Sequence, residues 1–284
     1  MYTQPITRSH HAAIVIAIDR SGSMAESITS DFTSKSKAEW VCDVVNTILF
    51  ELIEHARRLD DIHYYYDVAI IGYSGRGVEP ILGNSWFTPI TQLAELEPKI
   101  SIREVKRSTP SGELTSLRVQ HKEWIEPVAE GTTPMYEALC EIYHNVKEWC
   151  EEPSHLESFP PIIFNITDGE ASDCNPDSLI DISESIRSLS TSDGKALLLN
   201  CHIASCDDAE GVIFPSTKRE LGENKYAQML YHASSVMPKI FAPFISQLKG
   251  CKEHSKFVGM SFNSSIHELL SMLNIGSISL PTHN

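Results

Sequence analysis

Asp19, Ser21 and Ser23 stand at alternate positions after an apolar run, in the stretch IVIAIDRSGSM that starts at Ile14. A carboxylate and two hydroxyls offer only oxygen atoms, and the D-x-S-x-S spacing, folded into a turn, can direct three of them to one point. Hard oxygen donors favour a small divalent cation, Mg²⁺ or Mn²⁺, over Zn²⁺ or copper. The chemistry that this stretch suggests is therefore metal binding.

Two other segments carry donors of the same kind. Thr132 and Thr133 lie in EGTTPMYEAL, and Asp168 follows an apolar run in PPIIFNITDGEASD. In an open α/β sheet, ligands bind beyond the carboxyl ends of the strands, so residues that follow different strands can meet there. Mg²⁺ takes about six ligands and releases water reluctantly, so a few protein oxygens would leave a position open for water or an incoming oxygen.

The elements that must position these residues are strands alternating with helices, which predicts βαβ units. Continuous apolar runs predict buried strands at 12–18, 64–74, 160–169, 195–205 and 256–262. Apolar residues at helical spacing predict helices at 37–59, 134–150, 177–190, 223–237, 238–250 and 265–275. The expected fold is a doubly wound α/β fold, with a mostly parallel central sheet and helices on both faces.

No repeat or linker divides the chain, so residues 1–284 are expected to form a single domain with a core of about 10–275. Residues 78–130 lack sustained periodicity and contain Pro and Gly punctuation. We expect an irregular insertion there, made of a hairpin, loops and a short helix.

Charge and composition exclude several classes of function. The net charge is -15, with 23 Lys and Arg against 38 Asp and Glu, which argues against a nucleic-acid partner because phosphate binding needs a basic face. The N-terminal stretch lacks the apolar region of a signal peptide, and no apolar run approaches the ~18 residues of a membrane span. The seven cysteines show no C-x-x-C pair, which favours reduced thiols in a cytoplasmic protein without membrane contact.

Taken together, the three motifs resemble the von Willebrand factor A domain with a metal-ion-dependent adhesion site, of the intracellular bacterial type. The matching stretches are DRSGS at 19–23, GTTP at 131–134 and TDG at 167–169. The later segments NCHIAS, VIFPST, ASSVMP, FVGMSFNSS and MLNIGS extend the resemblance to the end of the chain. By this resemblance the threonine ligand is Thr133, and the metal ligands are Asp19, Ser21, Ser23, Thr133 and Asp168.

The resemblance also implies a function. In that family the metal completes its shell with a carboxylate from a protein partner, so we expect a metal-dependent protein-binding module that recognises an Asp or Glu, and not an enzyme. Bacterial members often belong to multi-protein stress or defence systems with kinase, phosphatase or AAA+ ATPase components, which makes an adaptor role plausible. The chemistry agrees with this implied function. Because few carboxylates bind the cation directly, it stays electrophilic enough to bind another one.

Two other functions stay open. A cation near Asp and Ser can promote phosphate hydrolysis, so a Mg²⁺- or Mn²⁺-dependent phosphohydrolase is the alternative, although Arg20 is the only cation expected nearby and no general base is evident. The sequence contains no nucleotide-binding loop or nucleophile elbow. A structural subunit with a non-essential metal is the third possibility.

Several other residues near the motifs are expected to have ordinary structural roles. We expect Arg20, Glu170 and Asp173 to be solvated, Met24 to be a packing residue, and His202 to be a satisfied core histidine. The pair His10 and His11 fits a disordered terminus better than a metal-binding tract.

Overall fold

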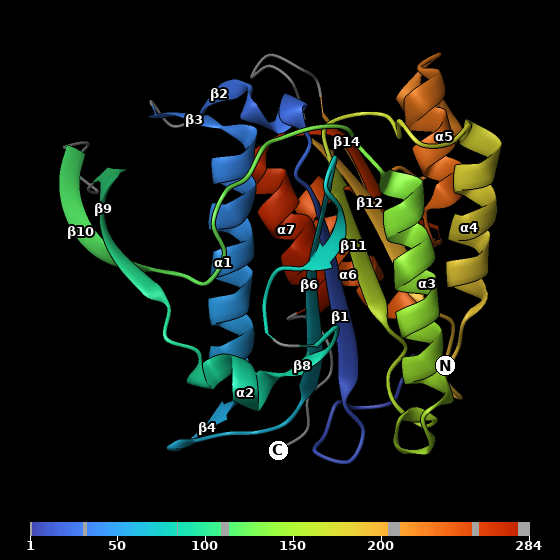
Figure 1. Cartoon of the computed structure of the whole chain (residues 1–284), viewed down its shortest axis with the longest axis horizontal. Helices are drawn as coiled ribbons and strands as arrows, with labels where there is room; N and C mark the ends of the chain where they lie inside the picture. The colour runs from blue at the N-terminus through green and yellow to red at the C-terminus, as the bar shows by residue number, and fades with distance from the viewer. Residues whose placement is uncertain are drawn as a thin grey trace.

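A mostly parallel β-sheet runs through the middle of the computed structural model, which describes residues 2–30, 33–83, 85–108, 114–203, 211–251 and 256–277 (Figure 1). The sheet order is β13-β14-β12-β11-β1-β6-β7, and β8 also pairs with β6. Its strands are β1 (Ala12–Asp19), β6 (Tyr66–Ser74), β7 (Gly77–Pro80), β8 (Thr88–Pro89), β11 (Ile162–Thr167), β12 (Leu197–Ile203), β13 (Val212–Ile213) and β14 (Met260–Ser264).

Strand β1 lies at the centre of the parallel part of the sheet. It pairs in parallel with β11 on one side and β6 on the other, so that Ile14 lies opposite both Ile162 and Val68. All eight residues of β1 are buried, which explains why the sequence shows a continuous apolar run and not an alternating one. The strands β11, β12 and β14 extend the parallel pairing, and β7, β8 and β13 are antiparallel additions at the edges.

Helices cover both faces of the sheet. One face packs against α1 (Lys37–Ala56), α2 (Ile90–Glu95), α6 (Ala242–Lys249) and α7 (Ile266–Ser277). The other packs against α3 (Met135–Glu151), α4 (Pro176–Ser188) and α5 (Lys225–Ala233). Successive residues of β1 point to opposite faces, so its isoleucines belong to the first core, whereas Ala13, Val15 and Ala17 belong to the second. The predicted α/β fold with helices on both faces is confirmed.

The remaining elements are short or stand outside the sheet. Residues 78–130 contain the hairpin of β9 (Lys99–Ser108) and β10 (Leu114–Glu123) and the short helix α2, as the punctuation of the sequence indicates. Two smaller hairpins pair β2 (Ser27–Ser30) with β3 (Thr33–Ser36) and β4 (Arg57–Arg58) with β5 (Asp61–Ile62). The 3-10 helices are η1 (Gly22–Ala25), η2 (Pro153–His155), η3 (Lys218–Leu221) and η4 (Lys239–Phe241). Among the described residues, no helix combines the length and apolar character needed to cross a bilayer.

One buried side chain ties the segment that follows the β9–β10 hairpin to the body of the molecule. Asn46, on α1, accepts hydrogen bonds from the backbone N–H groups of Trp124 (2.8 Å) and Ile125 (3.1 Å). Its amide donates to the carbonyl of Ile125 (3.2 Å). A single buried amide therefore satisfies three backbone groups of the segment that leads to the site.

Replacing Asn46 should lower stability strongly. Asn46→Ala is expected to reduce the free energy of unfolding by about 2–4 kcal/mol, since each buried polar group left without a partner costs about 1–3 kcal/mol. Urea unfolding followed by circular dichroism measures the change. The matched control is Asn145→Ala on α3, whose amide donates only to the carbonyl of Glu141 in its own helix. Equal midpoints for the two variants would contradict the anchoring role of Asn46.

Candidate metal centre

Three loops meet at the carboxyl edge of the sheet, where backbone hydrogen bonds hold them together. Directly after β1, the N–H of Arg20 donates to the carbonyl of Tyr73 at the end of β6 (2.9 Å). The N–H of Gly22 donates to the carbonyl of Gly131 (3.0 Å), and the N–H of Glu130 donates to the carbonyl of Arg20 (2.7 Å). The loop after β1 and the loop before α3 are therefore held in register by main-chain contacts.

The loop after β11 is joined to the same assembly. The N–H of Thr133 donates to Oγ of Ser172 (3.1 Å), and the N–H of Ser172 donates to the carbonyl of Thr133 (3.0 Å). The carboxylate of Asp173 accepts from the N–H groups of Tyr136 (3.1 Å) and Glu137 (2.9 Å) in the first turn of α3. Asp173 is exposed, as expected, and its carboxylate in addition satisfies helix N–H groups that have no partner within the helix.

Four of the five predicted ligands are linked by hydrogen bonds around their side-chain oxygens. Oγ of Ser21 lies 3.1 Å from Oγ of Ser23, which donates to Oδ1 of Asp168 (2.7 Å). Oδ1 of Asp19 accepts from the N–H of Ser21 (2.9 Å), and its Oδ2 accepts from Oγ1 of Thr167 (2.8 Å). The fifth predicted ligand, from the loop before α3, reaches this group through the backbone contacts described above.

The site is buried at its base and open at its rim. Asp19 is fully buried, Ser21, Thr133 and Asp168 are nearly so, and Ser23 is exposed. Burial raises the pKa of Asp19, although hydrogen bonds from Ser21 and Thr167 act in the opposite direction. Within the described chain Asp19 forms no ion pair, so a buried carboxylate faces several neutral oxygens without a counter-charge. A divalent cation would supply that charge, and the all-oxygen donor set fits Mg²⁺ or Mn²⁺.

A residue that the sequence analysis missed lies beside this group. The side chain of Lys37 is only 1% exposed, and its Nζ forms ion pairs with Oδ2 of Asp168 (2.8 Å) and Oε2 of Glu26 (2.6 Å). Burial lowers the pKa of Lys37, but the bonds to Asp168 and Glu26 outweigh burial and raise it overall. The expectation that Arg20 is the only cation nearby is therefore wrong.

The position of Lys37 has a topological cause. A helix that follows a parallel strand begins at the carboxyl edge where that strand ends, so the first turn of α1 faces the loop after β1. Ser36 begins α1 with a capping box, in which Glu39 accepts from the N–H of Ser36 and Ser36 accepts from the N–H of Glu39. This start fixes the backbone of Lys37, whose N–H donates to the carbonyl of Glu26 (2.9 Å).

Two residues next to the serines pack into the fold. Met24 is fully buried, as expected for a packing residue. Arg20 is not a solvated rim residue, because its side chain is 16% exposed and lies across Gly72, with Nη1 3.0 Å from Oε1 of Glu79. The backbone glycine leaves the space that the arginine occupies, since a Cβ at this position would lie 2.4 Å from Cδ of Arg20.

The expectations for His202 and Glu170 are borne out. His202 is buried on β12, its ring stacks on Phe262, and its Nδ1 accepts from the N–H of Asn263 (3.2 Å). Burial lowers the pKa of His202 to about 4, as expected for a neutral core histidine. Glu170 is exposed.

Gly131 allows the loop before α3 to approach the turn between β6 and β7. It has φ +72°, and a Cβ added there would lie 2.6 Å from Cα and 2.8 Å from the backbone nitrogen of Gly75. The glycine of the GTTP motif is thus required by both its backbone conformation and the close passage of a second glycine.

Substituting Gly131 should disturb the site as well as the fold. Gly131→Ala is expected to lower the free energy of unfolding by at least about 1–2 kcal/mol. A residue with a Cβ is strained at this positive φ, and the added Cβ would collide with the main chain of Gly75. Gly169→Ala is the control in the neighbouring motif, because its Cβ would meet no atom within 4 Å and its φ is not positive. Thermal unfolding of both variants tests this, and a destabilised Gly169→Ala beside an unchanged Gly131→Ala would refute it.

Comparisons with known proteins give limited similarity. No protein-family model matches the chain, and no curated protein matches it. Among solved structures, a von Willebrand factor type A protein from Catenulispora acidiphila aligns with TM-score 0.38 and 14% identity, covering 69% of this chain and 33% of that chain. An uncharacterized membrane spanning protein from Vibrio fischeri aligns with TM-score 0.29 and 13% identity, covering 74% and 76% respectively. This chain thus spans a third of the length of the first of these proteins.

Proposed function

We propose that this chain is a metal-dependent protein-binding module. Its carboxyl-edge centre would hold Mg²⁺ or Mn²⁺ through Asp19, Ser21, Ser23, Thr133 and Asp168, and an Asp or Glu of a protein partner would complete the shell. The observation that carries the proposal is the buried carboxylate of Asp19, which has hydrogen-bond donors but no cation in the described chain. When bound, the cation supplies positive charge that this carboxylate lacks and a coordination position for an incoming oxygen.

The charges of the site favour an anionic partner. Lys37 balances one of the two carboxylates of the ligand set through its ion pair with Asp168. Among the buried groups, a divalent cation with Asp19, Asp168 and Lys37 leaves one net positive charge, which a single carboxylate would neutralise. The other partner of Lys37, Glu26, has a side chain that is 59% exposed, so solvent screens its charge more strongly. The serine and threonine hydroxyls occupy positions without cancelling charge, so they preserve this preference.

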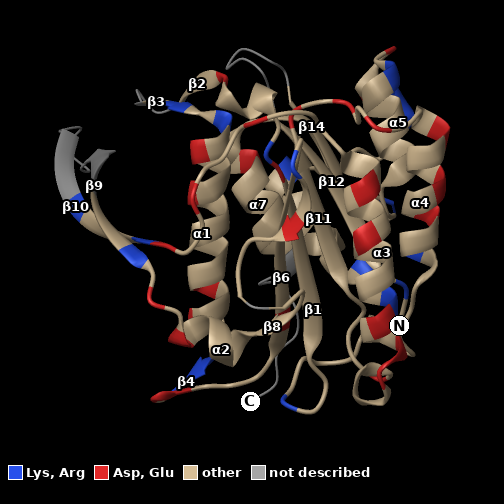
Figure 2. Ribbon diagram, in the orientation of Figure 1, with Lys and Arg blue, Asp and Glu red and all other residues tan. Residues whose placement is uncertain are grey.

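The rest of the surface restricts the partner. The chain carries a net charge of -15, and Figure 2 shows acidic residues along α3 and α4. A broadly acidic partner would be repelled, so one acidic residue within a neutral or basic patch fits best. By the family resemblance, an adaptor role alongside kinase, phosphatase or AAA+ ATPase components of a bacterial system is the broader setting that we propose.

A phosphohydrolase is the second candidate, because Lys37 does place a cation beside the ligand set. Its ammonium group, however, is buried between Asp168 and Glu26 and so is already engaged by two carboxylates. Turnover of a generic phosphate ester in Mg²⁺ or Mn²⁺, lost in Asp168→Ala, would favour the hydrolase. A partner complex that survives excess EDTA would instead favour a structural subunit.

Loss of the buried carboxylate should abolish metal binding. Wild-type protein is expected to bind one Mg²⁺ and to unfold at a higher temperature in millimolar metal. When the metal concentration is 100 times the dissociation constant, binding raises the free energy of unfolding by about 2.7 kcal/mol. Asp19→Asn keeps the shape of the side chain but removes the charge that offsets dehydration of the cation. Calorimetric titration should show no binding in this variant, and an unchanged affinity would place the metal elsewhere.

Lys37 should influence the metal and the partner in opposite directions. Lys37→Gln removes positive charge from the site, so Mg²⁺ should bind more tightly by about tenfold, equivalent to about 1.4 kcal/mol, while the partner carboxylate binds more weakly. Lys35→Gln is the control with the same change in charge, because Lys35 pairs with Asp43 and not with the ligand set. Calorimetry measures the first effect, and pull-down with and without EDTA measures the second. Weaker metal binding in Lys37→Gln would show that its role is to position Asp168.

An acidic residue in place of Thr133 should leave metal binding intact but weaken binding of the partner. Thr133→Asp adds a carboxylate to the shell, which should retain the cation and reduce its affinity for another anion. Once a partner is identified, single Asn or Gln substitutions of its acidic residues test the contact. If no single substitution weakens metal-dependent binding, direct coordination by the partner is wrong even where the metal binds.

A further inference from the structure

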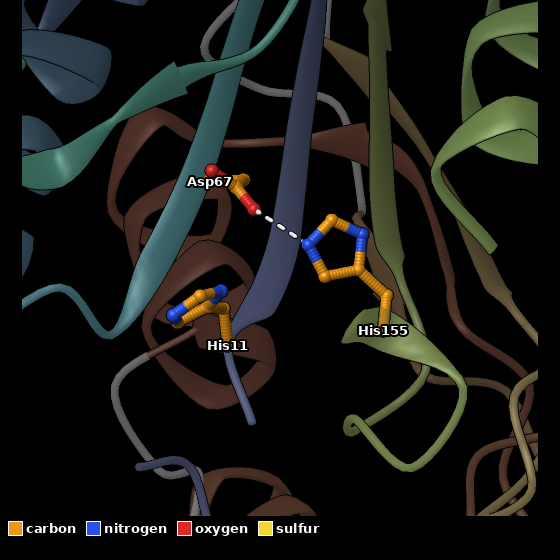
Figure 3. A group of neighbouring side chains, drawn as sticks. All are labelled: His11, Asp67 and His155. Carbon is orange, nitrogen blue, oxygen red and sulfur yellow. Dashed lines mark ion pairs between the residues drawn. The ribbon is translucent and has the colours of Figure 1, made fainter. Parts of the chain in front are cut away.

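A second group of metal-ligating side chains lies at the opposite edge of the sheet. His11 directly precedes β1, Asp67 lies at the start of β6, and His155 ends η2, the short helix after α3 (Figure 3). One ligand atom from each residue lies within 4.8 Å of the others, and Nε2 of His155 is 3.7 Å from Oδ2 of Asp67. These residues are distant in sequence, so no local motif announces the group.

The pair His10 and His11 does not behave as a disordered terminus, contrary to the expectation from sequence. The ring of His11 stacks on Tyr64 with centroids 3.7 Å apart, and its Nε2 contacts the carbonyl of Arg8 (2.7 Å). His10 contacts Glu157, with Nε2 3.4 Å from Oε2. The amino acids of this segment alone do not predict the aromatic and backbone partners that hold it in place.

Each ring is held through one of its nitrogens, which leaves a lone pair on the other nitrogen. A carbonyl can only accept, so Nδ1 of His155 carries the hydrogen that it donates to the carbonyl of Trp149 (3.0 Å). In the same way, Nε2 of His11 carries the hydrogen for the carbonyl of Arg8. The remaining nitrogens are Nε2 of His155, which faces Asp67, and Nδ1 of His11, which is buried and has no hydrogen-bond partner among the described residues. Histidines that ligate metals are fixed in this way by a backbone carbonyl on the other nitrogen.

Such an arrangement is unfavourable if nothing lies between the residues. In the neutral form, a nitrogen lone pair of His155 points at a carboxylate, and a buried nitrogen of His11 has no donor. The two rings lie close together, with centroids 5.9 Å apart, so a single ion could contact both. A cation that binds both lone pairs and the carboxylate would resolve all of these conflicts together.

Aromatic residues hold the three side chains in place. The ring of Trp149 stacks on His155 with centroids 4.2 Å apart, and its Nε1 donates to Oδ2 of Asp67 (2.9 Å). Tyr64, which stacks on His11, donates its hydroxyl to Oδ1 of Asp67 (2.6 Å). Each aromatic side chain therefore orients one histidine and the shared carboxylate, and Asp67 itself is 3% exposed.

We propose that His11, Asp67 and His155 form a zinc site. Two imidazole nitrogens and one carboxylate oxygen are a donor set that Zn²⁺ prefers and Mg²⁺ does not, with water as the fourth ligand. Tetrahedral Zn²⁺ with bonds of about 2.0–2.1 Å holds its ligands about 3.3 Å apart, so the ligand atoms need to approach one another by up to roughly 1.5 Å. The bound ion would join the segment before β1 to the end of α3. This site does not depend on the proposed function of the carboxyl-edge centre.

The experiment uses the whole 284-residue chain carrying Asp19→Asn, which removes the proposed centre at the other edge. Zn²⁺ is titrated in competition with a chromophoric chelator, and one Zn²⁺ per chain is expected. His11→Gln, Asp67→Asn and His155→Gln should each weaken binding by at least about tenfold. The matched control is His144→Gln, an exposed histidine on α3, which should bind as the parent does. Absence of Zn²⁺ binding at micromolar metal, or an affinity in the His11→Gln and His155→Gln variants equal to that of the parent, overturns the proposal.

A second measurement needs no substitution within the site. Co²⁺ replaces Zn²⁺ in such sites, and four-coordinate Co²⁺ with nitrogen ligands absorbs visible light far more strongly than six-coordinate Co²⁺ with oxygen ligands. The Asp19→Asn parent is expected to show the strong bands and to lose them when Zn²⁺ is added. Weak bands alone would overturn the site even if circular dichroism showed that the histidine variants fail to fold.

Discussion

Burial of β1 on both faces is the constraint on which the rest of the molecule depends. Its eight residues contribute nothing but apolar side chains until Asp19, so the strand can lie only at the centre of a covered parallel sheet. The chain must then leave the strand at an edge where backbone groups need new partners. The loops before α3 and after β11 supply those partners, and their polar side chains gather around one buried carboxylate as a result.

The sequence was sufficient for the features that depend on periodicity and on strand ends. Continuous apolar runs gave β1, β6, β11 and β12, and the motif positions after them correctly indicated that Ser21, Ser23 and Asp168 would meet at one edge. The approach of the GTTP loop follows from its glycine, which only a structure shows to lie against a second glycine. Metal ligation by these residues stays a prediction, because geometry shows donors and not occupancy.

Contacts between side chains that are distant in sequence could not be predicted. Lys37 has no sequence pattern that separates it from a solvated lysine, and only the direction of α1 brings its ammonium group to Asp168. Likewise, Asp173 occurs among polar loop residues, and its role depends on where the first turn of α3 lies. His11, Asp67 and His155 lie on three different segments, and each is fixed by an aromatic or backbone partner distant in sequence.

One strand separates the two groups of ligands, with His11 immediately before it and Asp19 as its last residue. At about 3.3 Å per residue, its length keeps these residues roughly 25 Å apart. At this separation two unit charges interact by only about 0.7 kcal/mol, at an effective dielectric constant of about 20. Electrostatics alone would therefore leave the two ends of the molecule independent, and any communication between them would have to be mechanical, carried by the packing of β1.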